Sequence, residues 1–203
     1  RRQRQMCIRD SRKISRIMAE NKDYLIKLDQ QNGDGDLGVS MSEGFEAAAV
    51  FVEGTSETDL GKILMQTGGV FNEAAPSSLG TIISFAFMGM AKSLKGKTEA
   101  GLPEFAEAVM AGVQKIMDKA GSKPGEKTIL DSIYPAAESL LADRDGDFKE
   151  ALRNAAEKAA EGSESTRSMK SVHGRAAYYG EKSIGLLDGG SVVGRLIFEA
   201  LSE

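Results

Sequence analysis

Residues 79–94 read LGTIISFAFMGMAKSL, and this stretch decides the fold class. A helix drawn through it is apolar on almost every side, because large apolar side chains recur at neighbouring positions: Ile82, Ile83, Phe85, Phe87, Met88 and Met90. A helix that is apolar all round is typically buried in the middle of a bundle. The stretch therefore predicts helix-on-helix packing, with this segment at its centre.

The rest of the chain divides into shorter amphipathic segments bounded by Gly, Pro or polar clusters. Their periodicity predicts helices over residues 15–28, 38–52, 57–73, 103–121, 128–141, 147–160 and 191–201. Pro135 is expected to kink its helix or to mark a partly irregular start, and Gly162 is expected to end the next one. Residues 163–190 are predicted to form a polar loop with one helical turn at 176–183. The pattern predicts an all-α fold, a barrel or bundle of about eight antiparallel amphipathic helices.

Composition limits the domain count and the functional class. A chain of 203 residues with 41% hydrophobic content suits a single domain. Its net charge of −4, with no concentrated basic face, argues against nucleic-acid binding. No apolar run approaches the roughly 18 residues of a membrane span. Cys7 is the only cysteine, so no intrachain disulfide is possible and a cytoplasmic location is expected.

Residues 1–11, RRQRQMCIRDS, stand apart from the rest of the chain. They are dense in Arg, lack a helical apolar period and resemble translated adaptor sequence. We expect a non-native or disordered extension here, followed by one domain over residues 12–203. The alternative is a basic arm that binds an acidic partner.

Residues 29–38, DQQNGDGDLG, place Asp29, Asp34 and Asp36 among glycines. Like charges this close repel one another unless a cation lies between them, and the glycines allow the backbone to bring the oxygens together. Such hard oxygen ligands suit Mg²⁺ or Ca²⁺. Two other interpretations stay open: a solvated acidic turn that caps the next helix, and a calcium loop starting at Asn32. The calcium loop requires Gly at its sixth position, where this chain has Leu37.

Four further segments carry polar groups that could serve a site. Residues 76–81, PSSLGT, form either a phosphate cradle at a helix start or a plain N-cap. Residues 121–128, GSKPGEKT, resemble a P-loop only loosely. Residues 174–190 offer Arg175 for a phosphate and Tyr178 for a base, or they form surface structure held by salt bridges. The acidic residues at 143–147 are interpreted as a solvated turn between helices.

The chain holds no set of residues that would make a nucleophilic enzyme. His173 is the only histidine, and no Ser–His–Asp or Cys–His combination exists. We therefore expect no catalytic side chain of that kind here.

Taken together, these motifs resemble the nucleotide-binding L subunit of dihydroxyacetone kinase. That family's Asp-x4-Gly-Asp-x-Asp-x-Gly signature is matched at residues 29–38. Its Pro-Gly-Asp/Glu-Lys-Thr loop is matched at residues 124–128, with Asp131 and Pro135 following. Its late Gly-Arg-Ala-Ser-Tyr-x-Gly-Glu-Arg-Ser-x-Gly signature is matched at residues 174–185. The similarity covers nearly everything after Ser11, and several motifs in order are far more specific than any one of them.

The resemblance implies a barrel of eight antiparallel helices that holds ADP or ATP and two Mg²⁺ ions at one end. The implied metal ligands are Asp29, Asp34 and Asp36. The implied nucleotide-site residues are Leu37, Gly38, Val39, Ser40, Ser77, Ser78, Gly121, Ile129, Arg175, Asp188, Gly189 and Gly190. It further implies phosphoryl transfer to dihydroxyacetone held on a K-type partner subunit. In a phosphotransferase-system form, an M-type phosphohistidine carrier recharges the bound ADP.

The sequence departs from the family pattern at several positions. The Gly-rich stretch before residues 79–94 is shortened to Pro76-Ser77-Ser78, and Leu37 stands where His or Thr is common. Asp188-Gly189-Gly190 replaces Asp-Pro-Gly, and Ala177 replaces Ser. These changes leave the acidic trio intact but put details of the nucleotide pocket in doubt. The alternative function is a calcium-binding helical interaction module without nucleotide.

Overall fold

The computed structural model describes residues 2–203, except for the side chains of Arg2, Asn32, Arg175 and Tyr179. Regular structure within these residues is helical throughout, without a strand, which confirms the all-α prediction. The α-helices are α1 (Arg2–Glu20), α2 (Lys22–Asn32), α3 (Leu37–Gly54), α4 (Leu60–Ala74), α5 (Ser78–Ser93), α6 (Leu102–Ala120), α7 (Leu130–Ala142), α8 (Phe148–Ser165) and α9 (Gly189–Leu201). Two 3-10 helices, η1 (Thr166–Ser168) and η2 (Arg175–Ser183), lie between α8 and α9.

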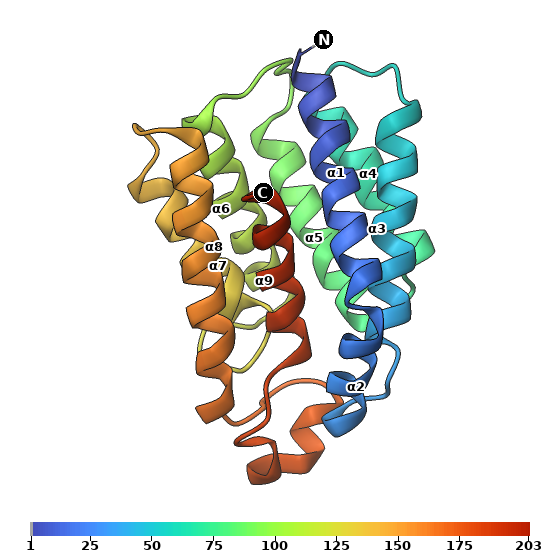
Figure 1. Cartoon of the computed structure of the whole chain (residues 1–203), viewed down its shortest axis with the longest axis vertical. Helices are drawn as coiled ribbons and strands as arrows, with labels where there is room; N and C mark the ends of the chain where they lie inside the picture. The colour runs from blue at the N-terminus through green and yellow to red at the C-terminus, as the bar shows by residue number, and fades with distance from the viewer. Residues whose placement is uncertain (1) are drawn as a thin grey trace.

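Eight of these helices form a closed ring whose members run alternately up and down (Figure 1). Each ring helix packs against the next along the chain, from α3 through α9, and α1 closes the ring by packing against both α3 and α9. The short α2 continues from α1 at the lower end. The alternation places the starts of α3, α5, α7 and α9 together at that lower end (Figure 1). The expected eight-helix antiparallel barrel is therefore confirmed.

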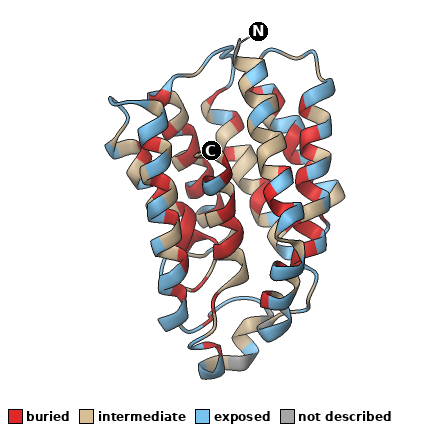
Figure 2. Ribbon diagram, in the orientation of Figure 1, coloured by how far each residue is buried: buried red, intermediate tan, exposed pale blue. Residues whose placement is uncertain are grey.

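Buried apolar residues from all eight ring helices form one core cluster. Exposed residues lie mainly on the outer faces and at the ends of the ring (Figure 2). All eight ring helices contribute to one interior surface, which surrounds an apolar cavity of about 430 Å³. Its lining includes Ile14, Phe45, Ile83, Val109, Ile133 and Phe198. No helix in the described residues 2–203 combines the length and apolarity that a membrane crossing needs.

The central position predicted for residues 79–94 is wrong, because α5 is one wall of the ring. Ile83 is buried, but Ile82, Phe85 and Phe87 are only partly buried. A wall helix contacts a neighbour on each side as well as the interior, so three of its faces need apolar residues. The apolar residues on most sides of α5 therefore face its neighbours α4 and α6 and the cavity, and they do not indicate a helix at the middle of the bundle.

Residues 2–11, for which we expected a non-native or disordered extension, are helical and form the first turns of α1. The division into an extension and one domain over residues 12–203 stays a prediction. Cys7 and Ile8 pack against a small buried cluster formed by Val52, Leu60, Ile63, Leu94 and Ala108. These two adjacent, partly buried side chains attach this end of the helix to the ring without a long apolar period. The predicted helix at 15–28 is also two helices, since the chain breaks at Asn21 between α1 and α2.

Gly162 does not end α8, as the sequence led us to expect. Pro135 has no N–H, so the carbonyl oxygen of Asp131 lacks its usual partner within α7. Gly162 of α8 lies directly against that oxygen, and a Cβ atom at position 162 would be only 1.9 Å from it. The glycine therefore allows α8 to approach α7, and α8 continues to Ser165.

Candidate functional site

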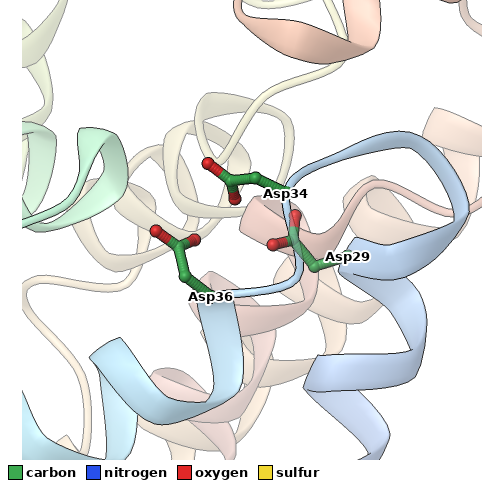
Figure 3. A group of neighbouring side chains, drawn as sticks. All are labelled: Asp29, Asp34 and Asp36. Carbon is green, nitrogen blue, oxygen red and sulfur yellow. The ribbon is translucent and has the colours of Figure 1, made fainter.

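The three aspartates converge at the turn between α2 and α3 (Figure 3). Asp29 lies in the last turn of α2, Asp34 in the connecting turn, and Asp36 at the N-cap position of α3. One oxygen from each carboxylate lies within 4.8 Å of the others. Oxygens that share one magnesium ion at about 2.1 Å lie roughly 3–4 Å apart, so a small adjustment would place these on a common ion.

The glycines of the turn are needed for this convergence. Gly35 has a positive φ of +82°, a conformation that other residues adopt only with strain. A Cβ atom at Gly33 would lie 2.2 Å from Oδ1 of Asp29, so only glycine leaves room for that carboxylate. Leu37 donates its backbone N–H to Oδ2 of Asp29 over 3.3 Å, which ties the end of α2 to the start of α3.

Crowding of the carboxylates changes their acidity. Partial burial raises the pKa of Asp29, and the neighbouring charge of Asp34 adds to the rise. The pKa of Asp36 is raised to about 6, first by desolvation and then by its hydrogen bond with Asp34 and the charges of Asp34 and Asp29. Negative charge is therefore costly in this turn, and a divalent cation would relieve the cost. Three carboxylates without sulfur or imidazole ligands fit a hard cation such as Mg²⁺.

The first turns of α3 and α5 meet beside the acidic turn. The hydroxyl oxygens of Ser40 and Ser77 lie 2.7 Å apart, although the residues are far apart in the sequence. Ser77 is the N-cap residue of α5 and accepts a hydrogen bond from the backbone N–H of Gly80 over 3.1 Å. The predicted site residues Ser40 and Ser77 therefore lie together, and the start of α3 lies beside the start of α5.

The start of α9 joins the same group. A Cβ atom at Gly189 would lie 2.6 Å from Cδ2 of Leu37, and one at Gly190 would lie 3.4 Å from the backbone nitrogen of Ile129. The structure thus brings the predicted residues Gly189 and Gly190 against Leu37 of α3 and against Ile129 at the start of α7.

Asp188 is the N-cap residue of α9, where its Oδ2 accepts the backbone N–H of Ser191 over 2.8 Å. Burial raises the pKa of Asp188 to about 7; the charge of Lys127 opposes the rise, and those of Asp131 and Asp29 add to it. Asp188 is therefore electrostatically coupled to the acidic turn.

The remaining predicted residues are less closely tied to this group. Gly121 ends α6 in the left-handed conformation at the same end of the ring, without a described contact to the others. Val39 lies in the first turn of α3 with a partly exposed side chain. The side chain of Arg175 lies outside the described part of the chain, but η2, which begins at Arg175, packs against α2. Tyr178 is 91% exposed, and its packing on a base stays a prediction.

Sequence reasoning assigned no structural role to two buried polar residues that shape this end of the ring. Asp131 accepts the backbone N–H groups of Gly125 (2.7 Å) and Thr128 (2.9 Å), which folds the loop before α7. Thr166 is fully buried, and its hydroxyl accepts the N–H of Asp188 over 3.1 Å. Asp131 was noted only as part of the family pattern, and Thr166 stands between the polar residues Ser165 and Arg167, so no pattern in the sequence marks it as buried.

Comparisons with known proteins agree with this geometry. The model of the DAK2 domain matches residues 31–203. The chain is 33% identical over 188 residues to the PEP-dependent dihydroxyacetone kinase 1, ADP-binding subunit DhaL, of Listeria innocua, covering 91% of this chain and 88% of that protein. It is 29% identical to the corresponding ADP-binding subunit DhaL of Escherichia coli, covering 86% and 84%.

Larger proteins contain a similar domain. The chain is 29% identical to the L-erythrulose 1-kinase of Mycolicibacterium smegmatis, with 94% of this chain matched to 34% of that protein. The crystal structure of the dihydroxyacetone kinase from C. freundii in complex with AMP-PNP and Mg²⁺ superposes with a TM-score of 0.79 at 21% identity. That match covers 97% of this chain and 33% of the larger one, and it establishes a shared fold. From its sequence, ring architecture and relatives, the chain belongs to the DAK2 domain family, that of the nucleotide-binding L subunits of dihydroxyacetone kinases.

Proposed function

We propose that this chain is the nucleotide-binding subunit of a dihydroxyacetone kinase and holds ADP or ATP at the lower end of the ring. The observation that carries the proposal is the meeting of three carboxylates with the starts of α3, α5 and α9. Carboxylates that hold cations beside helix N-termini that attract anions are the two parts of a metal–phosphate site.

Each part of this site has a separate task in phosphoryl transfer. Asp29, Asp34 and Asp36 hold magnesium, which we propose to be two ions. Bound magnesium neutralises the charge of the phosphate oxygens. The backbone N–H groups in the first turns of α3, α5 and α9 donate to the same oxygens, and the hydroxyls of Ser40 and Ser77 lie among them.

The other residues proposed to line the nucleotide site surround this phosphate-binding centre. Leu37, Gly189 and Gly190 form its packed floor, because the absence of a Cβ atom at Gly189 allows the start of α9 to lie against Leu37. The complete set proposed for the nucleotide is Leu37, Gly38, Val39, Ser40, Ser77, Ser78, Gly121, Ile129, Arg175, Asp188, Gly189 and Gly190. Positioning and electrostatics are the whole contribution of this set to the reaction.

The sugar is held by a partner in this proposal. The single histidine, His173, is exposed and pairs with Glu126 over 2.9 Å, so it is not arranged to bind a ketose covalently. A K-type subunit would hold dihydroxyacetone, and an M-type phosphohistidine carrier would rephosphorylate ADP, because two relatives are named PEP-dependent kinase subunits. A related ketose remains compatible, since one relative is named an L-erythrulose kinase.

Calorimetry tests the binding function directly. We expect saturable binding of Mg-ADP to the wild-type chain and a loss of affinity on the order of 100-fold in Asp34→Ala, because a metal ligand is removed. The matched control is Asp145→Ala, an exposed aspartate in the turn before α8, at the other end of the ring. Calcium binding combined with indifference to nucleotide would instead support the calcium-binding interaction module.

A coupled assay tests the division of labour. The isolated chain with ATP and dihydroxyacetone is expected to form no dihydroxyacetone phosphate, and product should appear when a K-type subunit is added. Turnover by the isolated chain would contradict the proposal that the sugar is held elsewhere.

A further inference from the structure

Lys127 is a buried lysine in the loop between α6 and α7 (residues 121–129), and only 3% of its surface is exposed. Its Nζ atom donates to three main-chain carbonyl oxygens: those of Met169 (3.2 Å), Ser183 (2.6 Å) and Leu186. An ammonium group has three N–H donors, so all of them are used. All three acceptors lie in the connection between α8 and α9 (residues 166–188).

The backbone at this position is strained to make these bonds. Lys127 has a φ of +63° and is the only non-glycine residue with positive φ in the part of the chain that the structure describes. A left-handed conformation costs a residue with a Cβ atom about 1–2 kcal/mol, a cost that glycine would avoid. A lysine that keeps this conformation while buried indicates that its side chain has a task that glycine cannot perform.

The α8–α9 connection has few other attachments to the loop at 121–129. Its own internal bonds include Gly185 N–H to the carbonyl of Arg167 and Ser171 N–H to the hydroxyl of Ser183. Across to the loop, the described side-chain contacts are those of Lys127 and the partly exposed pair of Glu126 with His173. Lys127 is therefore the buried attachment between these two segments.

We infer that Lys127 is a positioning residue of the nucleotide site: its ammonium group fixes the α8–α9 connection in place, and with it the η2 segment beside α2. The inference rests on the proposed nucleotide-binding function. The anchored connection runs from Thr166 to Asp188 and includes Arg175. Without the anchor, these residues would no longer be held in register with the acidic turn on α2 and α3.

The test compares Lys127→Met with the wild-type chain by two binding measurements. Calorimetry with Mg-ADP should show an affinity about tenfold lower or weaker still, because the segment that faces the nucleotide is loosened. Binding of Mn²⁺ alone, followed by electron paramagnetic resonance, should change less than about twofold, because no described contact joins Lys127 to the acidic turn. A residue that served only overall stability would leave nucleotide affinity unchanged well below the melting temperature.

Hydrogen exchange supplies a readout that needs no ligand. Amides of residues 169–186 should exchange faster in Lys127→Met, while those of residues 37–52 in α3 keep their wild-type rates. The matched control is Lys123→Met, which removes the same charge from an exposed position of the same loop and should match the wild type in every measurement.

A second variant covers the case in which Lys127→Met does not fold. Lys127→Arg keeps the positive charge near Asp188, but its planar guanidinium cannot direct donors toward three carbonyls as an ammonium group does. We expect it to fold and to bind Mg-ADP more weakly than the wild type.

Three results would overturn the inference: wild-type Mg-ADP affinity in folded Lys127→Met, wild-type affinity in Lys127→Arg, or unchanged exchange at residues 169–186. If the wild-type chain itself does not bind Mg-ADP, the proposed function fails, and the exchange experiment still decides whether Lys127 anchors the connection.

Discussion

Gly33 controls the geometry of the acidic turn through the space that it leaves beside Asp29. A methyl group at this position would collide with Oδ1 of Asp29, because the Cβ atom would lie 2.2 Å away. We therefore predict that Gly33→Ala displaces the carboxylate and lowers the affinity for Mg-ADP about tenfold or more, measured by calorimetry.

Gly54→Ala is the control for this substitution, since a Cβ atom at Gly54 meets no neighbouring atom within 4 Å. Equal Mg-ADP affinity in Gly33→Ala and Gly54→Ala would show that the position of Asp29 does not matter for binding.

Asp188 is predicted to make the stability of the nucleotide-free chain depend on pH. Its pKa is raised from 3.8 to about 7 in the folded state, so folding favours the protonated form. The free energy of unfolding includes the full stabilising contribution of the Asp188 carboxyl group below about pH 4. This contribution is lost as the pH rises through about 7. Asp188→Asn keeps a neutral acceptor for the Ser191 N–H, so it should be more stable than the wild type at pH 8 and similar to it near pH 4.

Thermal unfolding at several pH values, in the presence of a chelator, measures this difference. A shift from 3.8 to about 7 sets an upper limit of about 4 kcal/mol for the gain at pH 8. Parallel melting curves for the two proteins from pH 4 to pH 8 would contradict the predicted role of the Asp188 carboxyl group.

A comparison of the acidic turn with Lys127 shows which structural roles of residues can be predicted from the sequence. Asp29, Asp34 and Asp36 lie close in the chain, so their spacing among glycines made convergence of their oxygens one of the interpretations open from the sequence, and in the structure the oxygens converge. The partners of Lys127 are main-chain carbonyls more than 40 residues away. Every residue carries a carbonyl, so no pattern in the sequence identifies which of them a buried lysine will bind.

At the scale of the helices, α7 and α8 depend on the absence of a side chain at Gly162. We predict that Gly162→Ala destabilises the fold by about 1–3 kcal/mol, because its Cβ atom would lie 1.9 Å from the carbonyl oxygen of Asp131 and force the helices apart. Differential scanning calorimetry would detect this as a melting temperature lower by about 2–4 °C for each kcal/mol.

Gly69→Ala is the matched control within a helix, because a Cβ atom at Gly69 in α4 meets nothing within 4 Å. Replacing a helical glycine by alanine in open space should stabilise the protein by roughly 0.5–1 kcal/mol. A Gly162→Ala variant that is stabilised to the same extent would show that the close approach of α7 and α8 is not required.

A helix end could be predicted from the sequence where a residue at that end determines it. The prediction was wrong where a residue's role depends on a different helix. Gly121 ends α6, as the predicted range 103–121 indicated, and Asp147, the first residue of the predicted range 147–160, caps α8. Ser77 is an N-cap, which was one of the two interpretations of residues 76–81. The start of α4 was predicted three residues too early, at residue 57 instead of Leu60, where Asp59 caps the helix by accepting the N–H groups of Gly61 and Lys62. Gly162 was misread because its role is set by α7, a different helix.

At the scale of the whole molecule, the ring is closed by α1, and residues 2–11 lengthen that contact. Cys7 and Ile8 bury part of their surface against the cluster near Leu60. We predict that removal of residues 1–11 lowers the stability by about 1–2 kcal/mol through this lost burial. Calorimetric melting would show the loss, while Mg-ADP affinity should stay unchanged because the acidic turn lies at the opposite end of the ring.

An unchanged melting temperature after this truncation would show that residues 2–11 add nothing to the fold, as expected for an extension outside the domain. If the truncation lowered both the melting temperature and the affinity for Mg-ADP, the two ends of the ring would be coupled.

The number and direction of the ring helices could be predicted from the sequence, but their closure into a ring was harder to predict. Amphipathic periods and short connections indicate eight antiparallel helices whether they enclose a cavity or pack around a central member. The deciding fact is that α1 contacts α9, which joins the first and last helices of the chain. Contacts between such distant segments depend on the fit of whole surfaces, which no local pattern encodes.

The alternation of helix directions also governs how a ligand reaches this protein. Peptide dipoles of neighbouring antiparallel helices oppose one another, so their fields cancel a short way beyond the ends of the ring. The chain also carries a net charge of −4, which repels a polyanion at long range. A nucleotide is therefore attracted only once it is in contact with the site. We expect it to arrive with its divalent cation already bound. We also expect the association rate to be set by diffusion and orientation rather than by electrostatic steering.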